Sequence, residues 1–173
     1  QNDGVLEMAR LVEGDLRALG FQETAIVPSK GHPGVWGWFD AKAKKTLVVY
    51  MMYDVQPIEP TGWKVDAFAG ELVDDPKFGQ VLMARGATNQ KGTERAFLNA
   101  VASILAVNRK LPVNLMVLAE GEEELGSPNY PEIIGQYEDR LKTADGVMFP
   151  MNSQSPAGKV SMPMGVKGIW YVE

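Results

Sequence analysis

Thr46-Leu47-Val48-Val49-Tyr50-Met51-Met52 is the stretch that decides the fold. It is apolar at consecutive positions rather than at alternate ones, which is typical of a strand that is covered on both faces. The stretches 113–119 and 146–150 have the same character. Between them, residues 88–105 and 130–142 carry apolar side chains at helical spacing. This order predicts an α/β fold, a three-layer sandwich in which a mostly parallel mixed sheet carries helices on both faces.

The flanking segments add smaller elements to this frame. The apolar spacing of residues 5–19 predicts a helix that ends at Gly20. Alternating or apolar runs bounded by Gly and Pro predict strands, and these lie at 21–27, 35–39, 71–73, 80–83 and, once or twice, within 160–173. Residues 53–70 form a long loop, and a loop of this length in a compact domain is usually functional.

Composition excludes several classes of protein. The chain has 173 residues, 45% of them hydrophobic, so we expect one domain, 1–173, with a real core. A net charge of −5 argues against a nucleic-acid groove or an anionic membrane as a partner. There is no cysteine, no apolar run long enough for a membrane span and no signal-peptide pattern at the beginning, so the expected location is cytoplasmic.

Three loops follow or precede the buried stretches and carry the polar residues of interest. They are Met51-Met52-Tyr53-Asp54-Val55-Gln56-Pro57, Ala84-Arg85-Gly86-Ala87-Thr88-Asn89-Gln90-Lys91-Gly92 and Glu120-Gly121-Glu122-Glu123-Glu124-Leu125-Gly126-Ser127. Ligand sites in α/β sheets lie at the carboxyl ends of the strands. We therefore expect these loops to form one site rather than to be scattered.

The three loops resemble signatures of the zinc-dependent metallopeptidase family that includes aminoacylase, acetylornithine deacetylase, succinyl-diaminopimelate desuccinylase and carnosine dipeptidase. That family reads His-Tyr-Asp-Val-Gln-Pro in its first motif and Arg-Gly-Ala-Thr-Asp-Asn-Lys-Gly in its second. The resemblance extends from about residue 5 to 173 and corresponds to the N-terminal part of the catalytic domain. It implies that the family's lid and dimerisation domain and the C-terminal part are absent from this chain.

The resemblance also assigns roles to individual residues. Glu123 matches the general acid/base, which takes a proton from the attacking water and passes it to the leaving amine. Asp54 matches the carboxylate that orients a ligand histidine, and Glu124 matches a ligand of the second metal. Trp63 fits the family's loop pattern and is the expected substrate contact.

Three other ligand positions have changed. The resemblance places Met52 where the family has a ligand histidine, Asn89 where it has the bridging aspartate, and Met151 where it has a further aspartate. A neutral amide is a far poorer zinc ligand than a carboxylate, and zinc enzymes normally hold the metal with three protein ligands. The family uses two zinc ions, but for this chain we expect no cofactor.

The favoured hypothesis is a metal-free, inactive stand-alone domain, possibly engineered, derived from a dinuclear zinc amidohydrolase that cuts N-acyl amino acids or dipeptides. One alternative is an active metal-dependent hydrolase with Glu123 as general base and an atypical site on Glu124. Another is a non-catalytic module that binds a dipeptide-like or other small ligand, as a monomer or weak homodimer. The resemblance implies that Asp54, Asn89 and Glu124 converge, with Met52 and Met151 beside them. The family's bridging aspartate precedes a cis peptide bond, so the resemblance also points to the peptide after Asn89 as the position for one.

Overall fold

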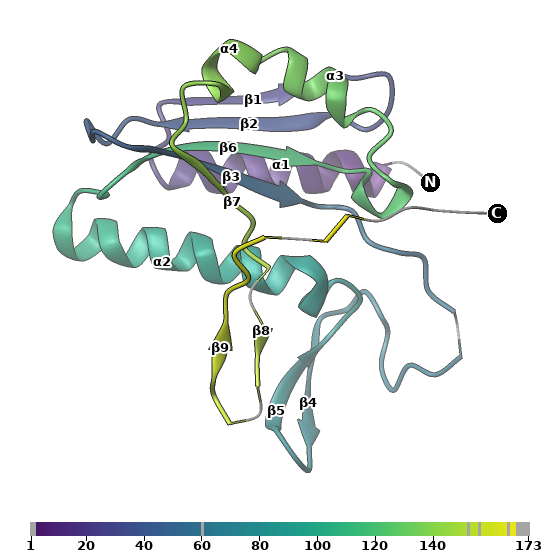
Figure 1. The fold of residues 1–173 in the computed structure, drawn as a ribbon. Coiled ribbons are helices and arrows are strands. Elements are labelled where there is room, and N and C mark those ends of the chain that lie inside the picture. The colour runs from purple at the N-terminus through teal and green to yellow at the C-terminus, as the bar shows by residue number, and fades with distance from the viewer. Residues whose placement is uncertain (1–2, 60, 152, 156, 166, 169–173) are drawn as a thin grey trace.

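The main sheet is mixed and has five strands in the order β1-β2-β6-β3-β7 (Figure 1). The computed structural model describes residues 3–59, 61–151, 153–155, 157–165 and 167–168. The strands are β1 (Glu23–Val27), β2 (Gly34–Phe39), β3 (Thr46–Met52), β6 (Asn114–Glu120) and β7 (Gly146–Met148). β2 is antiparallel to both β1 and β6, whereas β3 is parallel to both β6 and β7. β2 therefore runs against the other four strands, and the predicted mixed, mostly parallel sheet is confirmed.

Helices cover both faces of this sheet, as Figure 1 shows. α1 (Asp3–Ala18) and α2 (Gly92–Asn108) pack on one face through a cluster of buried residues that includes Leu16, Val49 and Leu98. α3 (Tyr130–Gly135) and α4 (Glu138–Leu141) pack on the other face. Successive residues of β3, such as Val48 and Val49, therefore enter different clusters. The three-layer sandwich is confirmed.

A glycine in β2 allows α1 to lie close to the sheet. A Cβ at Gly37 would lie 2.7 Å from Leu16 Cδ1 and 3.0 Å from Phe21 Cδ1. Any larger residue would therefore push α1 off the strand, because packed interiors leave no room for an extra carbon. α1 ends as predicted before Gly20, which has a φ of 88°.

The helix predicted over 130–142 is in fact two short helices. The backbone leaves the helical region at Tyr137, where φ is −125°, and the preceding helix ends at Gly135. The ring of Tyr137 stacks on Trp36 with 4.0 Å between ring centroids, and the Arg140 guanidinium lies 4.8 Å from the Trp36 ring. Packing on the sheet thus outweighs the helical spacing, which continues through the break.

Two small hairpins lie outside the main sheet. β4 (Glu71–Asp75) and β5 (Gly79–Met83) pair antiparallel, which confirms the short strands predicted at 71–73 and 80–83. β8 (Ser153–Gln154) pairs with β9 (Val160–Ser161), so the prediction for 160–173 is confirmed at its beginning only, and residues 166 and 169–173 lie outside the described residues. Within the described ranges, every helix is too short or too polar to cross a membrane.

Candidate functional site

The candidate site lies at the carboxyl edge of the parallel strands. β3 and β6 end together, with Met52 opposite Glu120 in the register. A 3-10 turn, Glu123–Leu125, follows β6, and a wide helical turn, Ala87–Lys91, precedes α2. The segments after β3 and β6 lie together because these strands are parallel, and the turn before α2 joins them, so the three loops of the sequence meet in one place.

Glu124 is the centre of this edge. Its backbone N–H donates to Asp54 Oδ2 at 2.9 Å, and its Oε1 accepts a hydrogen bond from Asn89 Nδ2 at 2.9 Å. Its Oε2 accepts from Gln56 Nε2, also at 2.9 Å. The predicted convergence of Asp54, Asn89 and Glu124 is confirmed. The peptide between Asn89 and Gln90 is cis, which is the predicted position.

Asp54 retains a buried oxygen without a partner. The residue is almost fully buried, and Oδ2 receives the Glu124 N–H. Among the described residues, Oδ1 has no hydrogen-bond partner. A buried carboxylate oxygen normally has at least one donor, so the unpaired oxygen marks a place from which a donor is missing. The side chain two positions earlier, Met52, is a thioether and offers no donor.

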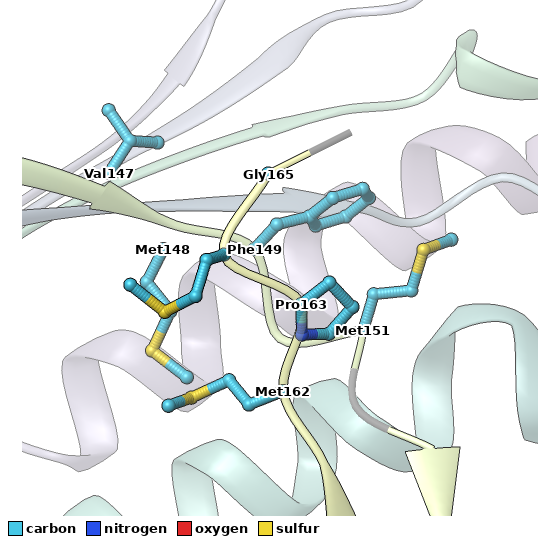
Figure 2. A pocket seen from close by; sticks show the side chains of 8 residues that line it. Val147, Met148, Phe149, Met151, Met162, Pro163 and Gly165 are labelled. Carbon is cyan, nitrogen blue, oxygen red and sulfur yellow. The ribbon is translucent and has the colours of Figure 1, made fainter. Parts of the chain in front are cut away.

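The two methionine positions lie in different surroundings. Met52 is fully buried, and its backbone N–H donates to Glu94 Oε1 at 2.7 Å. Met151 is 44% exposed and lines an apolar pocket with Met148 and Met162 (Figure 2). The described contacts do not join Met151 to the Glu124 centre, so its expected place beside that residue stays a prediction.

Glu123 is half-buried next to the same centre. Burial raises the pKa of its carboxyl group, and the nearby charges of Glu124 and Asp54 raise it further. A carboxylate with a raised pKa is a stronger base, which suits the role predicted from the sequence. No contact described here tests that role.

Two charged groups near β3, the buried Glu94 and the half-buried Lys91, were not predicted from the sequence. Burial raises the pKa of Glu94 to about 7, although the Met52 N–H and the charge of Lys91 act in the opposite direction. Burial lowers the pKa of Lys91, whose Nζ donates to the Tyr53 carbonyl at 2.5 Å. Glu94 shares one face of α2 with the buried Leu98, four residues on. A carboxylate on an apolar helix face was the signal that could have identified it.

A third buried carboxylate, Glu120, ends β6. Its Oε1 accepts hydrogen bonds from the hydroxyl groups of Tyr50 at 2.7 Å and Ser127 at 2.8 Å. Burial raises the pKa of Glu120, and these two hydrogen bonds lower it. Gly121 follows directly, and a Cβ there would lie 2.5 Å from the Tyr53 ring. The segment between β6 and Ser127 is therefore held by packing and hydrogen bonds, which fixes the position of Glu124.

Trp63, in the long loop after β3, is half-buried. The Arg85 guanidinium lies 5.2 Å from its ring centroid, a cation–π contact between two residues of the chain. The predicted substrate contact at Trp63 is not tested by this arrangement.

The donor set does not fit two zinc ions. Among the described residues, His, Cys, Asp and Glu side chains nowhere form a group of three that could hold a metal ion. Both oxygens of Glu124 face amide N–H donors, from Asn89 and Gln56. An N–H group cannot ligate a cation, and a structural or catalytic zinc site needs three or four protein ligands.

A covered mixed sheet with carboxylates on the loops at its carboxyl edge places the chain among α/β proteins that use this edge as a site. Comparison with known proteins makes the class specific. The model of Peptidase family M20/M25/M40 matches residues 48–163, more than half of the chain. The chain belongs to this peptidase family.

Individual relatives agree with this assignment. The Cys-Gly metallodipeptidase DUG1 of Candida albicans is 31% identical over 184 residues, covering 98% of this chain and 37% of the relative. The human Beta-Ala-His dipeptidase is 33% identical over 130 residues, covering 74% of this chain and 25% of the relative. The matched part thus spans 37% of the length of the first relative and 25% of that of the second.

Solved structures of the family share the fold. The M20 family metallo-carboxypeptidase Sso-CP2 from Sulfolobus solfataricus superposes with a TM-score of 0.79 at 36% identity, over 90% of this chain and 34% of the other. Human carnosine dipeptidase 1 superposes with a TM-score of 0.71 at 27% identity, over 84% of this chain and 32% of the other. The expected resemblance, and its position in the N-terminal part of the catalytic domain, are confirmed.

Proposed function

We propose that this chain is a peptidase scaffold of the M20 family that binds zinc poorly and does not hydrolyse peptides as it stands. One observation carries the proposal: the carboxylate expected to bind the second metal, that of Glu124, is already bonded through both oxygens to neutral amide groups. A metal ion would have to displace both donors and would gain only one charged ligand.

The first metal position supports the same proposal. Its expected ligands are Met52, Asn89 and Met151, which are two thioethers and an amide. None of these side chains carries a charge, whereas zinc sites in proteins are built from thiolate, imidazole and carboxylate ligands. The unpaired Oδ1 of Asp54 is consistent with an orienting carboxylate whose histidine has been lost.

Glu123 would then be a base without a substrate to act on. General-base catalysis contributes about 10²–10⁴-fold, which is a small part of what amide hydrolysis requires. The groups that hydrogen-bond Glu124 are uncharged amides, which polarise a scissile carbonyl far less than a metal ion does. The retained acid/base residue therefore does not by itself make the chain a hydrolase.

The pattern of replacement favours deliberate or concerted change over gradual drift. The segments 53–57, 85–92 and 120–127 resemble the family pattern, while the ligand positions Met52, Asn89 and Met151 have changed. Removing the charges also has a physical advantage, since buried carboxylates that face one another without a metal repel. An engineered origin is part of this proposal. The cytoplasmic location, the dipeptide-like ligand and the monomeric or weakly dimeric state stay predictions.

The experiment compares the chain with a variant in which three ligands are restored, Met52→His, Asn89→Asp and Met151→Asp. Both proteins are incubated with zinc, dialysed and assayed for bound metal and for hydrolysis of Cys-Gly and β-Ala-His. We expect the unmodified chain to retain no zinc and show no turnover, and the restored variant to retain zinc. Turnover by the unmodified chain that is lost in Glu123→Gln would overturn the proposal and support the active alternative. Binding of uncleaved dipeptide by the unmodified chain would support the binding-module alternative.

A further inference from the structure

A second cluster of unusual side chains lies away from the Glu124 centre. Four of the nine methionines of the chain, Met148, Met151, Met162 and Met164, line one pocket of about 370 Å³. The other four residues that line it are a valine, a phenylalanine, a proline and a glycine. The thioether sulfurs are therefore the only side-chain heteroatoms that the lining residues offer.

Two chain segments bring these methionines to one pocket. Met148 is the last residue of β7, whereas Met162 and Met164 follow β9, and the β8–β9 hairpin returns the chain to the end of β7. Figure 2 shows the thioether ends of Met148 and Met162 turned toward the same part of the pocket. The thioether of Met151 points away from them in the same view.

Core packing does not account for the two methionines after β9. Methionine commonly fills irregular gaps in cores, and Met116 is buried in this way. Met162 and Met164, however, are 65% and 96% exposed. Side chains this exposed fill no gap in the described core, and their thioethers are open to solvent.

We propose that Met148, Met162 and Met164 form a binding site for a soft monovalent cation, of the chemical class of Cu(I) and Ag(I). Thioethers are soft, polarisable ligands that select Cu(I) over the hard divalent ions bound by carboxylates. The lining side chains carry no charge, which favours a singly charged ion because burying a second charge without a counter-ion costs far more. The exposure of Met162 and Met164 leaves the sulfurs accessible to an ion arriving from solvent.

The three proposed ligands are not at the expected zinc positions, although Met151, which the resemblance places at one of them, lines the same pocket. The proposed site uses neither Glu124 nor Asn89, and the proposed function does not depend on it. The two ideas also predict opposite behaviour toward metals. The Glu124 centre is expected to retain no zinc, whereas the methionine pocket is expected to retain a soft ion without help from any carboxylate.

The test uses the whole chain labelled with ¹³C at the methionine methyl groups, titrated with Ag(I), with parallel calorimetry. We expect one Ag(I) per chain and shifts confined to the methyl signals of Met148, Met162 and Met164. The triple variant Met148→Leu, Met162→Leu, Met164→Leu should bind Ag(I) at least about tenfold more weakly, since it keeps the side-chain volume and removes the sulfurs.

The matched control replaces three methionines elsewhere by leucine, Met8, Met83 and Met116, and should keep the affinity of the unmodified chain. Circular dichroism of both triple variants checks that they fold. The proposal is overturned by non-saturable Ag(I) binding, by equal loss of affinity in the two triple variants, or by shifts that appear mainly at other methionines. Equal shifts with Zn²⁺ would also overturn it, because they would show that the pocket does not select soft ions.

Discussion

Returning Asn89 to the family's aspartate should destabilise this protein in the absence of metal. In the structure, Asn89 Nδ2 donates to Glu124 Oε1 at 2.9 Å. Asn89→Asp removes this donor and sets a second carboxylate against the first. The Asp54 carboxylate is already close to Glu124, since its Oδ2 accepts the Glu124 backbone N–H at 2.9 Å. Three carboxylates would then share one small volume.

The expected magnitude follows from two contributions. Loss of the hydrogen bond costs about 1 kcal/mol. Two like charges about 4 Å apart repel by about 1 kcal/mol in water and by about 4 kcal/mol at an effective dielectric constant near 20. Asn89 is exposed, so the smaller repulsion applies and the sum is about 2 kcal/mol. For a domain of this size, that corresponds to a fall in melting temperature of about 4–8 °C.

The assay is urea denaturation at pH 8 with a chelator present, with Asn89→Ala as the control. The alanine variant loses only the hydrogen bond, so the difference between the two variants measures the repulsion. This difference should shrink near pH 4, because repulsion raises the pKa of the paired carboxylates in the folded state and protonation removes their charge. An aspartate variant as stable as the parent, or no less stable than the alanine variant, would refute the reasoning.

Four further substitutions test the fold and the buried charge. Burial raises the pKa of Glu94 to about 7, so stabilisation by its protonated form is complete below about pH 4.5 and is lost as the pH rises through 7. The free energy of unfolding should therefore fall by up to about 3 kcal/mol between pH 4.5 and 8. In a pH series of urea denaturations, Glu94→Gln should make this fall smaller, because the glutamine does not titrate. The same pH dependence in the variant and the parent would contradict the prediction. Gly86→Ala should lower the free energy of unfolding by about 2–4 kcal/mol, because Gly86 has a φ of 82° and an added Cβ would lie 2.5 Å from Val55 Cγ1. Gly62→Ala is the matched control: Gly62 has a φ of 103° but open space around it, so the loss should be about 1 kcal/mol. Equal melting temperatures of the two variants would contradict this prediction. Leu118→Ala, at a fully buried position of the central strand, should cost about 3 kcal/mol in urea denaturation, and a cost below about 1 kcal/mol would show that the site collapses or that the strand is not central.

The sequence was most informative where one physical cause dominated. The run 46–52 became β3 with the predicted bounds, because a strand covered on both faces must be apolar at every position. The meeting of Asp54 and Glu124 was predictable because β3 and β6 run in parallel, so the residues that follow them lie at one edge of the sheet. Asn89 lies in the turn before α2, and its arrival at this edge followed from the family resemblance rather than from strand order. The prediction of a third strand covered on both faces at 146–150 was wrong, because β7 is the edge strand of the sheet and Val147 is 73% exposed.

Other features depend on contacts that a linear pattern does not contain. The break at Tyr137 reflects the stacking of its ring on Trp36, which is about 100 residues away in the chain. The hydrogen bonds from Gln56 and Asn89 to Glu124 depend on side-chain rotamers in three separate loops. Glu94 was overlooked because charged residues are rarely buried, although its position on the apolar face of α2 marked it.

The most direct test of the central claim is the zinc content and zinc affinity of the purified chain, by elemental analysis and calorimetric titration. We predict less than about 0.1 zinc per chain and no binding below about 100 µM, because the donors around Glu124 are neutral amides and three protein ligands are the norm for a catalytic zinc. One or more zinc ions bound tightly and stoichiometrically by the unmodified chain would contradict the account.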